Sequence, residues 1–127
     1  MSAKTAEAVK VIIRCRPMSS GEKEDGLQSV VQIFSARNEI MVTKPNSNEE
    51  PKQFTFDGVF DQNISQEDIY ERTAAPIVEN VLEGYNGTVF AYGQTGTGKT
   101  HTMTGIQGVH EQRGVIPRSF ENVFQSI

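Results

Sequence analysis

The sequence predicts an α/β fold in which a central, mostly parallel sheet is flanked by helices. Short apolar and β-branched runs typical of strands alternate with segments of helical periodicity. One apolar run, residues 88–92, leads directly into a glycine-rich loop and then into a helical pattern. At 127 residues, the chain is one domain or a piece of one.

Composition limits the class of protein. Twelve Lys and Arg residues stand against 16 Asp and Glu residues, and the resulting net charge of −4 argues against a nucleic-acid binder. The single cysteine, Cys15, cannot form an intrachain disulfide, and no metal-binding spacing of ligands is visible. The sequence has no signal-peptide pattern and no membrane-length apolar run, so we expect a cytoplasmic protein without membrane insertion.

The first half of the chain reads as strands. Alternating or apolar patterns predict strands over residues 9–16, 29–34, 39–44 and 53–57. Pro17 closes the first strand because it has no backbone donor, and Gly58 is expected to end the last. The second and third form a hairpin, and the charged residues 22–25 are expected to be a solvated turn.

The second half reads mainly as helix. Ser65, three residues before Asp68, forms an acidic variant of the capping box, and Gly84 is a plausible stop. Pro76 lies inside this pattern, which predicts either a kink or two consecutive helices, the second beginning there. Residues 88–92 then predict a strand covered on both faces, because the run is apolar without alternation.

A second helical region follows the glycines. It runs from Lys99 to Gly105, is interrupted by residues 105–114, and resumes at Val115. Ile127 is expected on its buried face, with no capping residue behind it, which favours a truncated domain.

Residues 93–100, GQTGTGKT, satisfy the phosphate-loop pattern G-x-x-x-x-G-K-[ST]. Without side chains, backbone N–H groups can converge on phosphate oxygens, helped by the positive end of the following helix. Lys99 supplies a mobile charge for the β and γ phosphates, and the Thr100 hydroxyl is placed to ligate Mg²⁺. The motif predicts a site for a nucleoside triphosphate with magnesium.

A phosphate loop does not select the base. If the first strand runs parallel to the strand before the loop, its end, from Arg14 to Pro17, can lie near Gly93. A guanidinium plane and a proline ring suit stacking on a purine, with His101 on the opposite face. A solvated strand-end charge at Arg14 and a surface histidine at His101 are the alternatives.

Four segments of the sequence resemble the kinesin motor domain: VIIRCRP, FTFDGVF, YNGTVFAYGQTGTGKTHTM and RGVIPRSFENVF. The resemblance covers residues 9–127, which would form the N-terminal part of the kinesin motor fold, a P-loop NTPase, after an N-terminal extension of residues 1–8. Similarity of FTFDGVF and EGYNGTVFAYGQTGTGKT points to the kinesins that carry cargo along cilia.

The resemblance implies ATP hydrolysis coupled to movement along microtubules, with ATP or ADP and Mg²⁺ bound, in the cytoplasm on the cytoskeleton and in cilia. Lys99 and Thr100 are implied in catalysis, with Thr100 as the Mg²⁺ ligand. Residues 105–114 would be the loop near the nucleotide that varies between motors and affects their kinetics. The implied nucleotide-binding residues are Gly93, Gln94, Thr95, Gly96, Thr97, Gly98, Lys99, Thr100, His101, Arg14, Arg16 and Pro17, of which Arg14, Pro17, His101 and more weakly Arg16 would flank adenine.

The sequence also departs from the family pattern. Hydrolysis in the family needs N-x-x-S-S-R-S-H-like and D-x-x-G-like switches, and neither string occurs in these 127 residues. Microtubule contacts are expected in a missing C-terminal half, and a cargo or coiled-coil partner chain in the full-length protein. We expect no ATP hydrolysis by the 127 residues alone. Two rival hypotheses are a nucleotide-binding fragment or inactive relative that does not hydrolyse, and an unrelated P-loop enzyme such as a nucleotide kinase.

Overall fold

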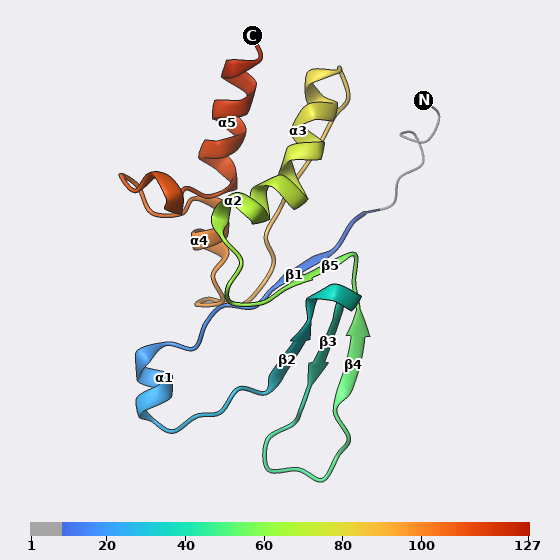
Figure 1. The fold of residues 1–127 in the computed structure, drawn as a ribbon, viewed down its shortest axis with the longest axis vertical. Coiled ribbons are helices and arrows are strands. Elements are labelled where there is room, and N and C mark those ends of the chain that lie inside the picture. The colour runs from blue at the N-terminus through green and yellow to red at the C-terminus, as the bar shows by residue number, and fades with distance from the viewer. Residues whose placement is uncertain (1–8) are drawn as a thin grey trace. The chain divides into compact units, whose positions relative to one another are not determined.

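The computed structural model describes residues 9–127, and the chain divides into two compact units (Figure 1). The first unit ends at Asn63, and the second spans Ile64–Ile127. The N-terminal extension expected over residues 1–8 lies outside the described residues.

The first unit is built from two small sheets. β1 (Ile12–Arg14) pairs in parallel with β5 (Gly58–Phe60), and this pair buries Val59 completely. The second sheet is antiparallel and contains, in this order, β2 (Val31–Phe34), β3 (Glu39–Val42) and β4 (Lys52–Thr55). The predicted hairpin is confirmed: a 3₁₀ turn, η2 (Ser35–Arg37), and left-handed Asn38 join β2 to β3.

The prediction that one strand ends at Gly58 is wrong, because Gly58 begins a strand. The chain changes sheets between β4 and β5. The N–H of Phe56 still donates to Asn38 in the antiparallel sheet, whereas the N–H of Asp57 donates to the Val11 carbonyl beside β1. The Asp57 carboxylate in turn accepts the Val11 N–H at 2.8 Å. Asp57 therefore pins the crossover through both its backbone and its side chain.

The charged segment after Pro17 is a short helix, α1 (Ser20–Glu24), and the predicted turn is wrong there. Ser19 caps the helix through a reciprocal capping box with Glu22. Glu22 also forms a two-point ion pair with Arg16, with both N–O distances at 2.8 Å. The expectation of a solvated segment holds, because α1 buries no residue.

The second unit begins with a helical stretch that changes its winding. α2 (Gln66–Ile69) continues through a π-helical segment (Tyr70–Ala74) into α3 (Ala75–Leu82). Ser65 caps α2 as predicted, accepting the Asp68 N–H at 3.0 Å. Pro76 lies in the first turn of α3 and lacks an N–H, and the preceding Ala75 N–H reaches back five residues to Tyr70. Of the two predicted alternatives, a kink or a second helix beginning at Pro76, the structure agrees with the second, and a π-helical turn joins the two helices.

The remaining helices of this unit are α4 (Lys99–Met103), the 3₁₀ turn η4 (His110–Gln112) and α5 (Val115–Gln125). α5 begins at Val115 as predicted. Its first residue joins a small core with Tyr70, Ala74 and Ala75. Ile127 was expected on a buried face and is 90% exposed, because α5 ends before it.

The strand predicted over residues 88–92 is absent from the described residues 9–127: this segment runs from α3 to α4 without strand pairing (Figure 1). Val89 packs against the core, but Phe90 and Tyr92 are 74% and 96% exposed. A strand exists only with a hydrogen-bonded neighbour, and all strands of the described chain lie in the first unit. The apolar run is therefore present without the sheet that would cover it.

Candidate functional site

The glycine-rich loop, residues 93–98, is tightly folded at its beginning. A Cβ atom on Gly93 would lie 2.5 Å from the Thr97 hydroxyl oxygen, so a larger residue there would displace the Thr97 side chain. That hydroxyl donates to the Gln94 carbonyl at 2.6 Å, and the Thr97 N–H donates to the same carbonyl at 3.2 Å. These two hydrogen bonds between Thr97 and Gln94 hold the turn at the start of the loop.

Gly96 and Gly98 take backbone conformations that other residues avoid. Their φ angles are +86° and +101°, in the left-handed region that costs other L-residues about 1–2 kcal/mol. A Cβ atom at Gly96 would meet no heavy atom within 4 Å. Glycine is therefore needed at this position for backbone conformation and not for close packing, and the space beside its backbone is open.

The loop leads directly into the first turn of α4. Gly98 is the N-cap residue and has no side chain with which to cap the helix, whose first backbone hydrogen bond joins the Thr102 N–H to the Gly98 carbonyl at 3.0 Å. The N–H groups of a first helical turn lack intrahelical acceptors and carry partial positive charge. This end of α4 is thus suited to an anion.

Two predicted side chains stand at this helix end. Lys99 is half-buried and forms no ion pair with any of the described residues 9–127. Thr100 follows it and is exposed. The structure therefore brings a positive charge without a carboxylate partner, a hydroxyl and a row of backbone donors to one place.

The insert after α4 is closed by its own backbone. Gly105 bridges to Arg113, the Ile106 N–H donates to the Gln112 carbonyl at 2.9 Å, and the Gly114 N–H donates to Thr104 at 3.1 Å. A Cβ on Gly114 would lie 2.6 Å from the Met103 carbonyl. Close backbone approach explains why glycines flank the insert.

A residue that sequence reasoning missed connects α4 to this insert. Gln66 is 5% exposed, and its side-chain amide donates to the His101 carbonyl at 2.6 Å and to the Gln112 carbonyl at 3.3 Å. The sequence does contain a pattern that indicates the burial of Gln66. This residue precedes Ile69 and Tyr70 by three and four residues, which places it on the apolar face of its helix. A polar side chain on such a face needs a buried partner.

The residues predicted to flank adenine are distributed over both units. In the first unit, Arg14 is half-buried in β1, and this burial lowers the pKa of its guanidinium. The hydrogen bond to Glu22 raises the pKa of Arg16, whereas Pro17 is exposed. In the second unit, His101 is exposed on α4. That these residues flank one base stays a prediction.

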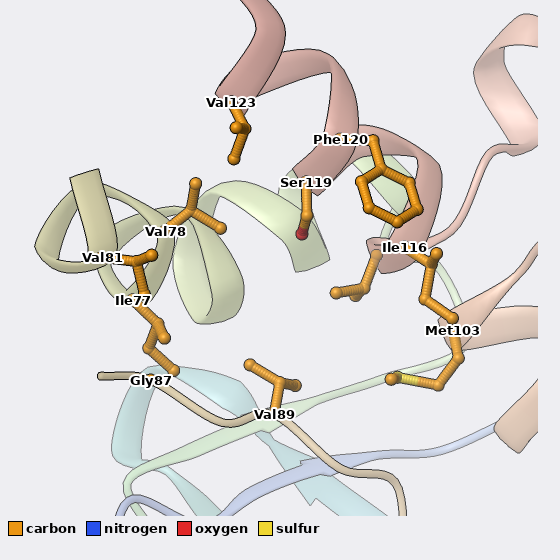
Figure 2. Close-up of a pocket in the computed structure, with 11 residues that line it drawn as sticks. Ile77, Val78, Val81, Gly87, Val89, Met103, Ile116, Ser119, Phe120 and Val123 are labelled. Atoms are coloured by element: carbon orange, nitrogen blue, oxygen red, sulfur yellow. The ribbon is translucent and has the colours of Figure 1, made fainter. Parts of the chain in front are cut away.

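The second unit also contains an apolar cavity of about 270 Å³ between α3 and α5 (Figure 2). It is lined by Ile77, Val78, Val81, Gly87, Val89, Met103, Val115, Ile116, Ser119, Phe120 and Val123. Ser119 is the one hydroxyl among these residues, and none of them is charged. The lining is therefore unsuited to phosphate. In this respect the cavity differs from the glycine-rich loop of residues 93–98. Within residues 9–127, no helix is long and apolar enough to cross a bilayer.

Comparison with known proteins places the chain in a family. The model of the kinesin motor domain matches residues 14–127. The kinesin-like protein KIF3C of Bos taurus is 48% identical over 126 residues, and the KIF3C proteins of Pongo abelii and Mus musculus are 46% identical. These alignments cover 98% of this chain but 16% of each relative, so the chain spans about a sixth of their length. The chain belongs to the kinesin motor domain family.

Proposed function

We propose that residues 93–100 bind the triphosphate of ATP, with Mg²⁺, as part of a microtubule-dependent motor ATPase. The observation that carries the proposal is the combination at the start of α4. Glycines in left-handed conformations lead into an uncapped helix end, beside which Lys99 has no carboxylate partner in the described chain. A triphosphate would satisfy the backbone donors and neutralise the lysine.

Each part of the loop has its own role in this proposal. The backbone N–H groups from Gly96 to Thr100 bind phosphate oxygens, and the Lys99 ammonium interacts with the β and γ phosphates. The Thr100 hydroxyl is the Mg²⁺ ligand. Bound ATP supplies the γ-phosphoryl group that is transferred to water in the complete motor.

Recognition of adenine by Arg14, Pro17 and His101 is a further part of the proposal and rests on the family resemblance. Arg16 is the weakest member of this set, because its guanidinium is already engaged by Glu22 within the first unit. An Arg16 that binds Glu22 contributes to holding α1 in place.

The motor context follows from the family. The kinesin-like relatives support movement along microtubules, and we propose that filament contacts and a cargo or coiled-coil partner belong to the larger protein. Location on the cytoskeleton and in cilia is part of the same proposal. The 127 residues alone would not hydrolyse ATP, because they contain neither switch string of the family.

Binding and co-sedimentation experiments on the complete motor protein test this function. We expect ATP binding that depends on Mg²⁺ and is weakened about 10- to 150-fold in Lys99→Ala, and microtubule co-sedimentation that changes with ATP. Binding without phosphate release would support the non-hydrolysing alternative. Phosphate transfer to a nucleotide acceptor, without microtubule binding, would support an unrelated P-loop enzyme.

A further inference from the structure

Gln66 is the most buried polar residue of the described chain and lies at the start of α2. Its side chain contacts backbone carbonyls in two other elements: His101 in α4 and Gln112 at the end of η4. The His101 contact is the shorter, at 2.6 Å. One amide group thus joins α2, the helix that follows the phosphate loop, and the insert.

The contact between Gln66 and His101 lies where the α-helical hydrogen bonding of α4 ends. In an uninterrupted α-helix, the N–H of Gly105 would donate to the His101 carbonyl, four residues back. Here both the Thr104 and Gly105 N–H groups donate to Thr100, at 2.8 and 3.0 Å. The helix closes on Thr100, and the Gln66 amide donates to the His101 carbonyl in the same part of α4.

The insert end of the contact is also held in place. The Gln112 carbonyl accepts the Ile106 N–H at 2.9 Å in addition to the Gln66 amide. Arg118 in α5 donates to the carbonyls of Glu111 and Arg113, and Arg113 pairs with Glu121 of α5. Gln66 therefore connects the phosphate-loop helix to an insert that is itself fixed to α5.

We propose that Gln66 is a positioning residue that sets the orientation of α4, and with it Lys99 and Thr100, relative to the insert. This inference rests on the proposed function of residues 93–100. Gln66 acts through the backbone carbonyls of His101 and Gln112, to which its amide donates. A displacement of the Gln112 carbonyl would therefore be transmitted to α4 through this amide.

Two variants of Gln66 distinguish a role in positioning α4 from a role that depends only on the size of the side chain. Gln66→Met keeps the length of the side chain but removes both donors. Gln66→Glu keeps the shape and places carboxylate oxygens against two carbonyls, and burial would raise the pKa of this carboxyl group. Once protonated, it has one O–H donor with which to restore one of the two contacts. Glu67→Met, at the exposed neighbouring position, is the matched control.

The experiment uses the complete motor protein and measures ATP affinity, together with amide hydrogen exchange at Thr104 and Gly105 in the nucleotide-free protein. We expect Gln66→Met to weaken ATP binding about three- to tenfold and to accelerate exchange at both amides. At pH 8, the ATP affinity of Gln66→Glu should equal that of Gln66→Met, and at pH 5.5 it should recover towards the wild-type value. The ratio of the ATP affinities of Gln66→Met and wild type should be the same at both pH values. Glu67→Met should match wild type.

Affinity and exchange of Gln66→Met within a factor of about 1.5 of wild type would overturn the inference, as would a Gln66→Glu variant without pH-dependent recovery. If Gln66→Met fails to fold, Gln66→Glu decides through its pH dependence. If the wild-type motor binds no ATP, the proposed function fails, and the exchange rates alone decide whether Gln66 holds α4.

Discussion

Two glycine-rich segments of the second unit, the phosphate loop (residues 93–98) and the insert (residues 105–114), use the same residue type in opposite ways. Both contain glycines with positive φ. The insert closes on itself through a bridge and backbone bonds, and arginines bind its carbonyls. In the described structure, residues 93–97 are joined only by the two bonds from Thr97 to Gln94.

The difference teaches how to distinguish a structural loop from a binding loop. Buried or strained backbone is tolerated when its donors and acceptors are satisfied, and the insert satisfies them through its own backbone and through Gln66 and Arg118. The phosphate loop keeps its glycine conformations while leaving donors near Lys99 for an external partner. Substitutions in the insert should therefore affect folding, and substitutions in the phosphate loop should affect ligand binding.

The largest effect on stability is expected at Gly105. A Cβ there would lie 2.0 Å from the Gln112 carbonyl oxygen, and φ is +75°. Gly105→Ala should lower the free energy of unfolding by about 2–5 kcal/mol, the sum of left-handed strain and overpacking. Gly108→Ala, with φ at +84° and open space, should cost only the strain, about 1–2 kcal/mol. Equal midpoints of urea unfolding for the two variants would contradict the close backbone packing of the insert at Gly105.

Lys99→Ala should give the largest loss of ligand binding. Removing a charge-assisted contact should weaken ATP by about 1.5–3 kcal/mol, or about 10- to 150-fold, with little change in stability. Calorimetric titration of the complete motor protein measures the affinity. Lys23→Ala, an exposed lysine of α1, is the control and should bind normally. An affinity of Lys99→Ala within twofold of wild type would contradict the assignment.

A smaller effect on ATP affinity is expected from residues that contact the base and not the phosphates. Replacing both Arg14 and His101 with alanine should weaken ATP by about 0.5–2 kcal/mol through lost stacking on the base. Binding of inorganic tripolyphosphate should remain unchanged, because the phosphate loop is intact. Equal losses for both ligands would show that the two side chains act on phosphate or on folding.

The smallest effect is expected at the Arg16–Glu22 pair on the surface of the first unit. The hydrogen bond from Arg16 lowers the pKa of Glu22 to about 2. Because the folded-state pKa is depressed, the stabilisation is present above the unfolded pKa and lost as pH falls through the folded value. The stability difference between wild type and Glu22→Gln should therefore shrink between about pH 5 and pH 2. A difference that stays constant over this range would contradict the pairing.

Local sequence signals predicted much of the second unit. Ser65 caps its helix and Val115 begins α5, as the sequence pattern predicted. These features depend on interactions between residues close in sequence, which a pattern can encode. Gln66 was missed because its partners, His101 and Gln112, are 35 and 46 residues away.

The errors share a physical cause. Residues 88–92 have strand composition but no neighbouring strand in the described chain, and the break between β4 and β5 depends on Val11 and Asn38, which are distant in sequence. The helix α1 is capped by Ser19 and pairs with Arg16, and both residues lie outside the charged run itself. Composition predicts what a segment prefers, whereas its hydrogen-bond partners decide what it forms.

The most direct test compares Gly96→Ala with Gly108→Ala. The two glycines are matched, with φ of +86° and +84° and no heavy atom within 4 Å of a Cβ, but one lies in the phosphate loop and the other in the insert. In the complete motor protein, both variants should lose a similar, small amount of unfolding free energy. Calorimetry should show ATP binding weakened at least about tenfold in Gly96→Ala and unchanged in Gly108→Ala. Equal ATP affinities for the two variants would contradict the assignment of the phosphate loop as the ligand-binding segment.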